Sequence, residues 1–192
     1  MTEPRQGRMK LIALAALFVA PLAIAWLWFG NIERFTPTDS AAHGELIAPA
    51  QPLGGFALAG VAGGPTVTAE TLHGRWTIVQ MGGAQCDETC RESLWEARQV
   101  HTRLGRDAVR VQRLYVVAGD VEVTDPAFFA DEHPDLLLAR IDAEDAVFSE
   151  LEAGHTYLVD PLGNLMMRYG PDAEPKDLLA DLKRLLRVSR IG

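Results

Sequence analysis

The sequence contains few cysteines and fewer basic than acidic residues. Cys86 and Cys90 are the only cysteines among 192 residues. Lysine and arginine total 18 against 26 aspartates and glutamates, which gives a formal net charge of -8. Proteins gain affinity for DNA or RNA by displacing counterions with basic side chains, so this balance argues against a nucleic-acid partner. Internal repeats and low-complexity tracts are also absent, and the length suits one domain of ordinary size.

Charge is absent from residues 11–30, which read LIALAALFVAPLAIAWLWFG. An apolar run of this length is enough to cross the hydrocarbon core of a bilayer as a helix. The basic residues of segment 1–10 place that end in the cytoplasm by the positive-inside rule, and Trp26 and Trp28 suit an aromatic belt at the far end. No small-x-small cleavage site follows the run, which favours an uncleaved anchor over the alternative, a cleaved signal peptide.

The predicted organisation has four parts. Residues 1–10 form a cytoplasmic N-terminus, residues 11–30 a transmembrane anchor, residues 31–52 a tether with scattered prolines, and residues 53–192 a single domain. This topology predicts a single-pass protein of the bacterial inner membrane whose domain faces the periplasm. Disulfides persist in that compartment.

Hydrophobic periodicity predicts alternating strands and helices in the domain. The expected elements, in chain order, are a small hairpin within 53–75, a buried strand at 76–81, a helix at 87–104, a strand at 109–118, a short helix that opens at Asp125-Pro126 and closes before Pro134, a strand at 136–141, a helix at 143–152, a hairpin with strands at 155–160 and 165–170, and an amphipathic helix at 174–188. This alternation implies an α/β fold, a mixed sheet flanked by helices. A closing hairpin and helix are typical of the thioredoxin-like fold.

The two cysteines lie four residues apart at the predicted start of a helix. That spacing places both sulfurs on one helical face, and the positive end of the helix dipole favours the thiolate form. Three interpretations are open at this point. A structural disulfide is compatible with the periplasm, although so short a loop stabilises little. A redox dithiol usually has the spacing CxxC, whereas two thiolates with a third ligand suit Cu(I).

A copper site of this kind would take an imidazole as its third ligand, and the sequence holds five histidines. His155 is the candidate, because in a thioredoxin-like fold the loop before the closing hairpin packs beside the cysteine helix. His43 and His73 are expected to be solvated, and His101 lies too far along the helix from the first cysteine to share a metal. His133 is expected to be a helix cap or a surface group.

Several of these segments together resemble the Sco/SenC proteins, thioredoxin-like copper chaperones of cytochrome c oxidase assembly. The matching segments occur in the family's order: GRW at 74–76, CDETC at 86–90, and His155 ahead of TYLVDPLG. The resemblance spans residues 53–188 and implies that both cysteines and His155 are copper ligands. Arg91 stands where the family usually has proline, which indicates a divergent member.

The resemblance also implies a function. The protein would bind copper, as Cu(I) or Cu(II), through Cys86, Cys90 and His155 while anchored in the membrane. It would help to assemble the copper site of a haem-copper oxidase, with an oxidase subunit or an assembly factor as its partner. Two alternatives stay open. One is a thiol-disulfide oxidoreductase that keeps a client's copper-site cysteines reduced, with the two cysteines as its catalytic residues. The other is a non-catalytic thioredoxin-like assembly factor.

Overall fold

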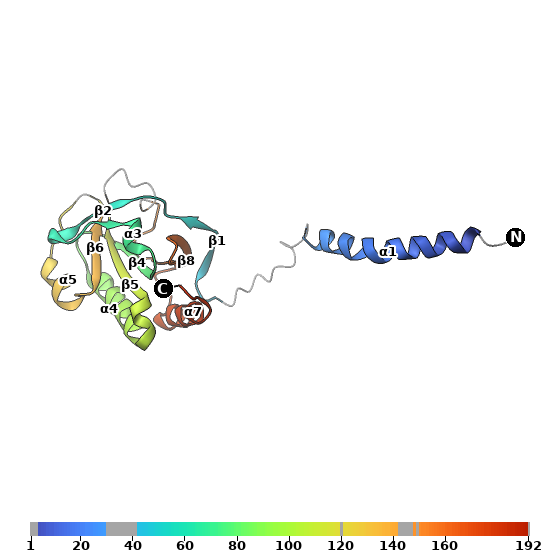
Figure 1. Ribbon diagram of the computed structural model, residues 1–192. Helices are drawn as coiled ribbons and strands as arrows, with labels where there is room; N and C mark the ends of the chain where they lie inside the picture. The colour runs from blue at the N-terminus through green and yellow to red at the C-terminus, as the bar shows by residue number, and fades with distance from the viewer. Residues whose placement is uncertain (1–3, 30–41, 120, 142–147, 149, 192) are drawn as a thin grey trace. The chain divides into compact units, whose positions relative to one another are not determined.

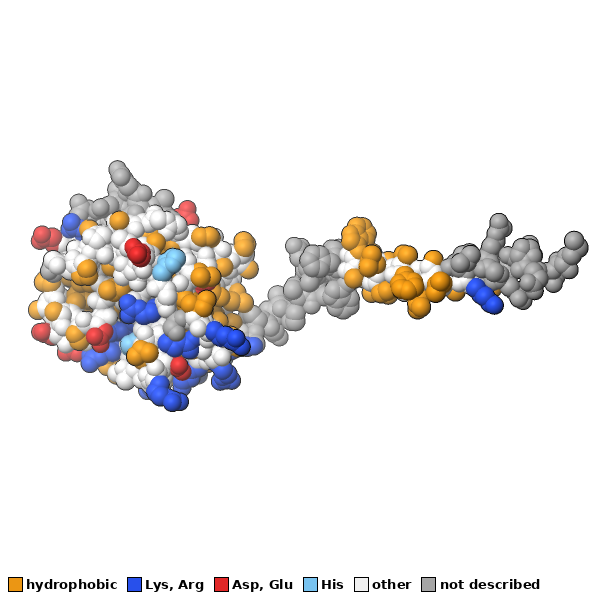
Figure 2. Space-filling model, viewed as in Figure 1, with side chains coloured by type: hydrophobic (Ala, Val, Ile, Leu, Met, Phe, Trp, Pro, Cys, Tyr) orange, Lys and Arg blue, Asp and Glu red, His pale blue; other side chains and the backbone are white. Residues whose placement is uncertain are grey.

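The computed structural model describes residues 4–29, 42–119, 121–141, 148 and 150–191 (Figure 1). The chain separates into two compact units, Met1–Ser40 and Ala41–Gly192. The first unit contains helix α1, Pro4–Phe29, and hydrophobic side chains cover much of its visible surface (Figure 2). Within the described residues, no helix is both long enough and apolar enough to span a membrane. The transmembrane segment therefore stays a prediction.

The second unit is built on one eight-stranded mixed sheet with the strand order β1-β8-β7-β4-β5-β6-β2-β3. The strands are β1 Glu45–Pro52, β2 Ala57–Gly60, β3 Val67–Thr68, β4 Trp76–Gly82, β5 Val111–Val117, β6 Leu136–Arg140, β7 Thr156–Val159 and β8 Asn164–Tyr169. Strand β5 runs parallel to β4 and β6, and the remaining pairs are antiparallel. The helical elements are η1 Val61–Gly63, α3 Ala69–Leu72, α4 Glu88–Arg103, η2 Gly105–Arg110, α5 Pro126–Glu132 and α7 Pro175–Val188.

Apolar side chains cover both faces of the sheet. Because successive side chains of a strand point to opposite faces, the central strand β4 contributes to two separate clusters. Ile78 packs in a cluster that includes buried apolar side chains from α4 and from α7. Val79 and Met81 pack in the opposite cluster, with side chains of the segment 53–72 and with Phe148. The thioredoxin-like arrangement predicted from the order of the elements is confirmed.

The boundaries of most elements agree with the sequence prediction, but residues 45–52 do not. We assigned them to the tether, whereas they form β1, an edge strand that pairs with β8. Its prolines, Pro49 and Pro52, hid the strand from sequence reasoning, because proline removes a ladder donor and is tolerated mainly on edge strands. The helix predicted at 143–152 lies largely outside the described residues.

A buried glutamine fixes α4 on the sheet. The amide of Gln80, in β4, donates hydrogen bonds to the hydroxyl of Ser93 at 2.6 Å and to its backbone carbonyl at 3.1 Å. Gln80 is only 4% exposed, so these bonds form where the unpaired amide would be costly. They set the height of α4 above the strand that leads into the cysteine segment.

A buried carboxylate joins α7 to the start of the second unit. Asp181 accepts backbone hydrogen bonds from His43 at 2.9 Å and Gly44 at 3.0 Å, and a hydroxyl hydrogen bond from Tyr169 at 3.0 Å. Burial, followed by the nearby Asp181 carboxylate, raises the pKa of Tyr169. The carboxylate thus fastens the residues before β1, the end of β8 and helix α7 to one another.

We expect Asp181→Ala to lower the free energy of unfolding by about 3 kcal/mol, because it leaves buried donors without an acceptor. Asp177→Ala is the matched control on the same helix. Asp177 forms a partly exposed ion pair with His43, so its loss should cost less than about 1 kcal/mol. Urea denaturation of the two variants measures both values. Equal losses would contradict a special role for Asp181.

Candidate functional site

The cysteine pair lies at the junction between β4 and α4. Asp87 is the N-cap of α4, and its carboxylate accepts a hydrogen bond from the backbone N–H of Cys90 at 2.9 Å. Aspartate is favoured at this position because it satisfies a free N–H group of the first turn. We predicted both cysteines in the first helical turn. Only Cys90 is there, because the cap at Asp87 leaves Cys86 just before the helix.

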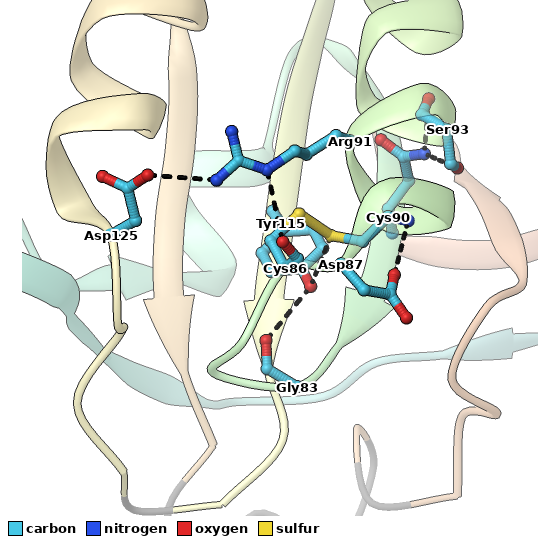
Figure 3. Close-up of a disulfide and its surroundings, with 9 residues drawn as sticks. Gly83, Cys86, Asp87, Cys90, Arg91, Ser93, Tyr115 and Asp125 are labelled. Atoms are coloured by element: carbon cyan, nitrogen blue, oxygen red, sulfur yellow. Dashed lines mark hydrogen bonds and ion pairs between the residues drawn. A yellow bond between two sulfur atoms is a disulfide. The ribbon is translucent and has the colours of Figure 1, made fainter.

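The two sulfurs form a disulfide (Figure 3). The S–S distance is 2.00 Å and the Cα atoms are 5.2 Å apart. Both cysteines are half-buried and pack against a small apolar cluster made of α4, β5 and α5 side chains. The structure therefore shows the pair in its oxidised, disulfide-bonded state. A structural disulfide and a redox pair both include this state, whereas a metal site would require the reduced thiols.

Tyr115 contacts the sulfur of Cys90 from β5 and was missed from the sequence. Its hydroxyl lies 3.3 Å from the sulfur of Cys90 and donates a hydrogen bond to the backbone carbonyl of Gly83 at 3.3 Å. Burial and, second, the Asp87 carboxylate raise the pKa of Tyr115 to about 12, so the hydroxyl keeps its proton at neutral pH. The available signal was a tyrosine inside a buried strand, VRVQRLYVV, where apolar residues were expected.

Gly82 makes room for this hydroxyl. A Cβ atom at position 82 would lie 2.0 Å from the hydroxyl oxygen of Tyr115. The two strands are in parallel register, with Gly82 beside Val117 and Gln80 beside Tyr115. The glycine that ends β4 therefore has a packing role beside the disulfide in addition to ending the strand.

Arg91 connects the cysteine segment to α5. Its Nε donates a hydrogen bond to the backbone carbonyl of Cys86 at 3.3 Å, and its terminal nitrogen pairs with Asp125 at 3.0 Å (Figure 3). The guanidinium carbon also lies 4.1 Å from the ring centroid of Phe128. The hydrogen bond from the Phe128 N–H, followed by the one from Arg91, lowers the pKa of Asp125. Arginine at this position thus fixes the carbonyl of the first cysteine, which a proline could not do.

His155 lies in the loop that leads into β7. Because β7 pairs with β4, and the N–H of Gly154 donates to the carbonyl of Met81 at 3.1 Å, the loop lies beside the end of β4. The side chain of His155 is 19% exposed, and its Nε2 lies 3.4 Å from a carboxylate oxygen of Glu152. Its Nδ1 is buried and has no hydrogen-bond partner among the described residues.

His155 and Cys90 line one cavity of about 690 Å³. Among the described residues, no lysine or arginine lines this cavity. Five carboxylate side chains do line it: Asp87, Glu92, Glu96, Asp172 and Glu174. Burial, and then the charge of Glu92, raises the pKa of Glu96. Such a cavity attracts cations.

The described residues contain no group of three histidine, cysteine or acidic side chains arranged to hold a metal ion. The structure thus joins the two cysteines directly and places His155 in the cavity that Cys90 lines. Cys86 is not among the residues that line it. Whether these three side chains act as metal ligands stays a prediction.

The remaining histidines lie apart from this cavity. The Nδ1 of His43 lies 3.3 Å from a carboxylate oxygen of Asp177. The Nε2 of His101 lies within hydrogen-bonding distance of the backbone carbonyls of Ala108, at 3.0 Å, and Val111, at 2.9 Å. His73 is exposed, as predicted. His133 caps α5, one of the two roles predicted for it, and its side chain is buried, only 3% exposed, and does not lie on the surface.

Fold and site together define a thioredoxin-fold protein with a CxxxC disulfide beside an acidic cavity. The sequence matches the family described as transmembrane-like, thioredoxin-like, C-terminal domain over residues 76–189, more than half of the chain. The protein belongs to this family. No curated protein matches the sequence.

Solved structures of Sco proteins are similar to this chain. Copper-bound ScoI of Bradyrhizobium japonicum is 25% identical, with a TM-score of 0.52, and the match covers 68% of this chain and 97% of that one. Copper-bound Sco1 of yeast is 15% identical, with a TM-score of 0.60 and coverages of 72% and 90%. A putative thiol:disulfide interchange protein DsbE of Chlorobium tepidum is 16% identical, with a TM-score of 0.55 and coverages of 73% and 97%. The resemblance to Sco proteins that the motifs predicted is confirmed, at an identity that makes this chain a divergent relative.

His133 should make the stability of the fold depend on pH. Burial, followed by the charges of Arg113 and Arg98, lowers the pKa of His133 to about 4. In the unfolded chain the pKa of this histidine is near its ordinary value of 6.5. The neutral, buried His133 therefore contributes to the free energy of unfolding above that pH, and this contribution is lost as the pH falls toward about 4. We expect a loss of at most about 3 kcal/mol over this window.

Denaturation series between these pH values test this expectation. A His133→Phe variant should show a flatter dependence of the unfolding free energy on pH, while a variant at the exposed His73, His73→Ala, should match the parent protein. A parallel dependence in all three proteins would contradict the assignment.

Proposed function

We propose that the reduced protein binds Cu(I) through Cys86, Cys90 and His155, and that it serves the assembly of the copper site of cytochrome c oxidase. The observation that carries the proposal is the shared cavity of Cys90 and His155. Two thiolates and an imidazole form a donor set that suits Cu(I). The buried Nδ1 of His155 has no partner among the described residues, so it lacks a competing hydrogen bond.

The charge of the cavity agrees with a cationic cargo. Its carboxylates line the same cavity as Cys90 and raise the local concentration of cations without themselves being soft-metal ligands. The similar Sco structures of Bradyrhizobium japonicum and yeast contain copper. Because the disulfide occupies both sulfurs, reduction must come before metal binding.

A second candidate function is thiol-disulfide exchange, and the observed disulfide favours it. In this role the reduced pair would reduce the copper-site cysteines of an oxidase subunit or of an assembly factor, and would itself become oxidised. The similarity of fold to a putative thiol:disulfide interchange protein agrees with this role. The two functions use the same sulfurs but differ in their need for His155.

We expect the reduced full-length chain to bind one Cu(I), measured by competition with a chromogenic chelator. Cys86→Ser and Cys90→Ser should each abolish competitive binding, and His155→Ala should weaken it by at least about tenfold. His73→Ala is the matched control and should bind as the parent does. Retention of stoichiometric binding after the loss of both thiols would refute the copper site.

The same histidine variant separates the two candidates. Exchange of the disulfide with a client peptide that carries two cysteines should proceed at the parental rate in His155→Ala. If a double cysteine variant still supports oxidase assembly in cells, neither function is the essential one, and a non-catalytic assembly factor is indicated.

We further propose that residues 11–30 anchor the protein in the inner membrane and that the domain faces the periplasm. The uncharged run and the basic residues before it support this placement. The full chain should stay in the membrane fraction after alkaline carbonate washing, and a chain without residues 1–30 should be released. A domain-side Cys86→Ser variant serves as the control and should fractionate like the parent. Release of the full chain by carbonate would exclude an integral anchor.

A further inference from the structure

We propose that the hydroxyl of Tyr115 determines the order in which the Cys86–Cys90 disulfide opens. An incoming thiolate attacks the sulfur of Cys86, and the sulfur of Cys90 leaves. The inference deepens the proposed function, since both candidate roles require the disulfide to open and close.

The surroundings of the two sulfurs are unequal. The sulfur of Cys90 lies 3.3 Å from the Tyr115 hydroxyl, and Cys90 belongs to the first turn of α4. Negative charge that develops on this sulfur is stabilised both by the hydroxyl proton and by the N-terminal end of the helix. Cys86 precedes the helix, and Arg91 donates a hydrogen bond to its backbone carbonyl, not to its sulfur. The Asp87 carboxylate at the N–H of Cys90 and the Arg91 guanidinium at the carbonyl of Cys86 act in the opposite sense, but both are exposed and screened by water, whereas the Tyr115 hydroxyl is buried. The buried hydroxyl therefore makes the sulfur of Cys90 the better leaving group.

The hydroxyl has one proton and two neighbouring acceptors. In the disulfide state it donates to the carbonyl of Gly83, and the disulfide sulfur competes for it weakly. Once Cys90 becomes a thiolate, the charge-assisted hydrogen bond to sulfur is the stronger one. A small rotation about the C–O bond is enough to transfer the donation from the carbonyl to the sulfur.

The position of the hydroxyl is rigid. Tyr115 is only 2% exposed, and its ring lies 5.5 Å from that of Phe129, centroid to centroid. The absence of a side chain at Gly82 leaves the space that the hydroxyl occupies. Because the ring is held in this way, the donor is in place before the sulfur acquires charge, as electrostatic stabilisation of a reaction requires.

Thiol-disulfide exchange at this pair conserves both atoms and electrons. An external thiolate forms a new S–S bond with Cys86, the Cys86–Cys90 bond breaks, and its electron pair leaves with the sulfur of Cys90. In the opposite direction, the thiolate of Cys86 attacks a client disulfide and releases one client thiolate. The thiolate of Cys90 then attacks the sulfur of Cys86, which restores the disulfide and releases the second client thiolate. Two electrons pass from the protein to the client.

The test uses the oxidised full-length chain and glutathione as the attacking thiol. The reaction is stopped with an alkylating reagent, and mass spectrometry of the peptides shows which cysteine carries glutathione and which carries the alkyl group. In the parent protein we expect glutathione mainly on Cys86. In Tyr115→Phe, the loss of one charge-assisted hydrogen bond should reduce that preference by about tenfold and slow the opening several-fold.

Tyr169→Phe is the matched control, because it removes another buried hydroxyl, one that bonds Asp181 and not the disulfide. It should keep the parental preference. Gly82→Ala is a second, independent variant, since the added Cβ displaces the Tyr115 hydroxyl, and it should lose the preference as Tyr115→Phe does. A merely loosened structure would speed opening at both sulfurs without changing their ratio.

An unchanged ratio in Tyr115→Phe, or glutathione mainly on Cys90 in the parent protein, would overturn the inference. The measurement needs neither copper nor a client, so its result is independent of whether the chain binds Cu(I). Failure of metal binding with an intact preference for Cys86 would refute the copper role alone.

Discussion

The parallel pairing of β4 with β5 is the constraint on which the site depends. It joins Trp76–Gly82 to Val111–Val117 over their full length at the centre of the sheet. The end of β4 begins the cysteine segment, β5 supplies Tyr115, and β7 on the other side of β4 brings the loop of His155 to the same edge. Parallel strands need a crossover connection between them, and here that connection contains α4, the helix that carries Cys90. One pairing therefore places three segments that are far apart in the sequence.

The disulfide is held on two sides by different kinds of interaction. Tyr115 approaches the sulfur of Cys90 from the sheet, within the apolar cluster, where its neighbours keep it out of water. Arg91 donates a hydrogen bond to the backbone carbonyl of Cys86 at the surface, and it is held there by an ion pair with Asp125, the N-cap of α5, and by a contact with Phe128 of α5. The buried contact is the stronger influence on chemistry, because exposed ion pairs are screened by water and salt.

The cavity beside the pair differs in character from the disulfide's own surroundings. Carboxylates from α4 and from the loop before α7 line it, with His155 as the sole imidazole among the described lining residues. An arrangement of this kind suits a cation near a soft donor pair. In the two proposed functions the sulfurs alone would support electron exchange, and the addition of an imidazole would support a metal.

The sequence by itself determined the α/β class, the thioredoxin-like order of elements and the helix start at Asp87. It also identified Cys86, Cys90 and His155 as candidate site residues. The class, the order of elements, the helix start and the cysteine pair follow from local rules, because periodicity, capping and residue spacing act over a few positions. His155 was selected instead by the resemblance to a known fold and family. The edge strand β1, the burial of His133 and the role of Tyr115 were decided only by the tertiary structure. Each depends on a partner far along the chain: β8 for the strand, Arg98 of α4 and Arg113 of β5 for the histidine, and the register of β5 against β4 for the tyrosine. No local pattern encodes such a partner, since the free energy that selects it is released only when the sheet is assembled.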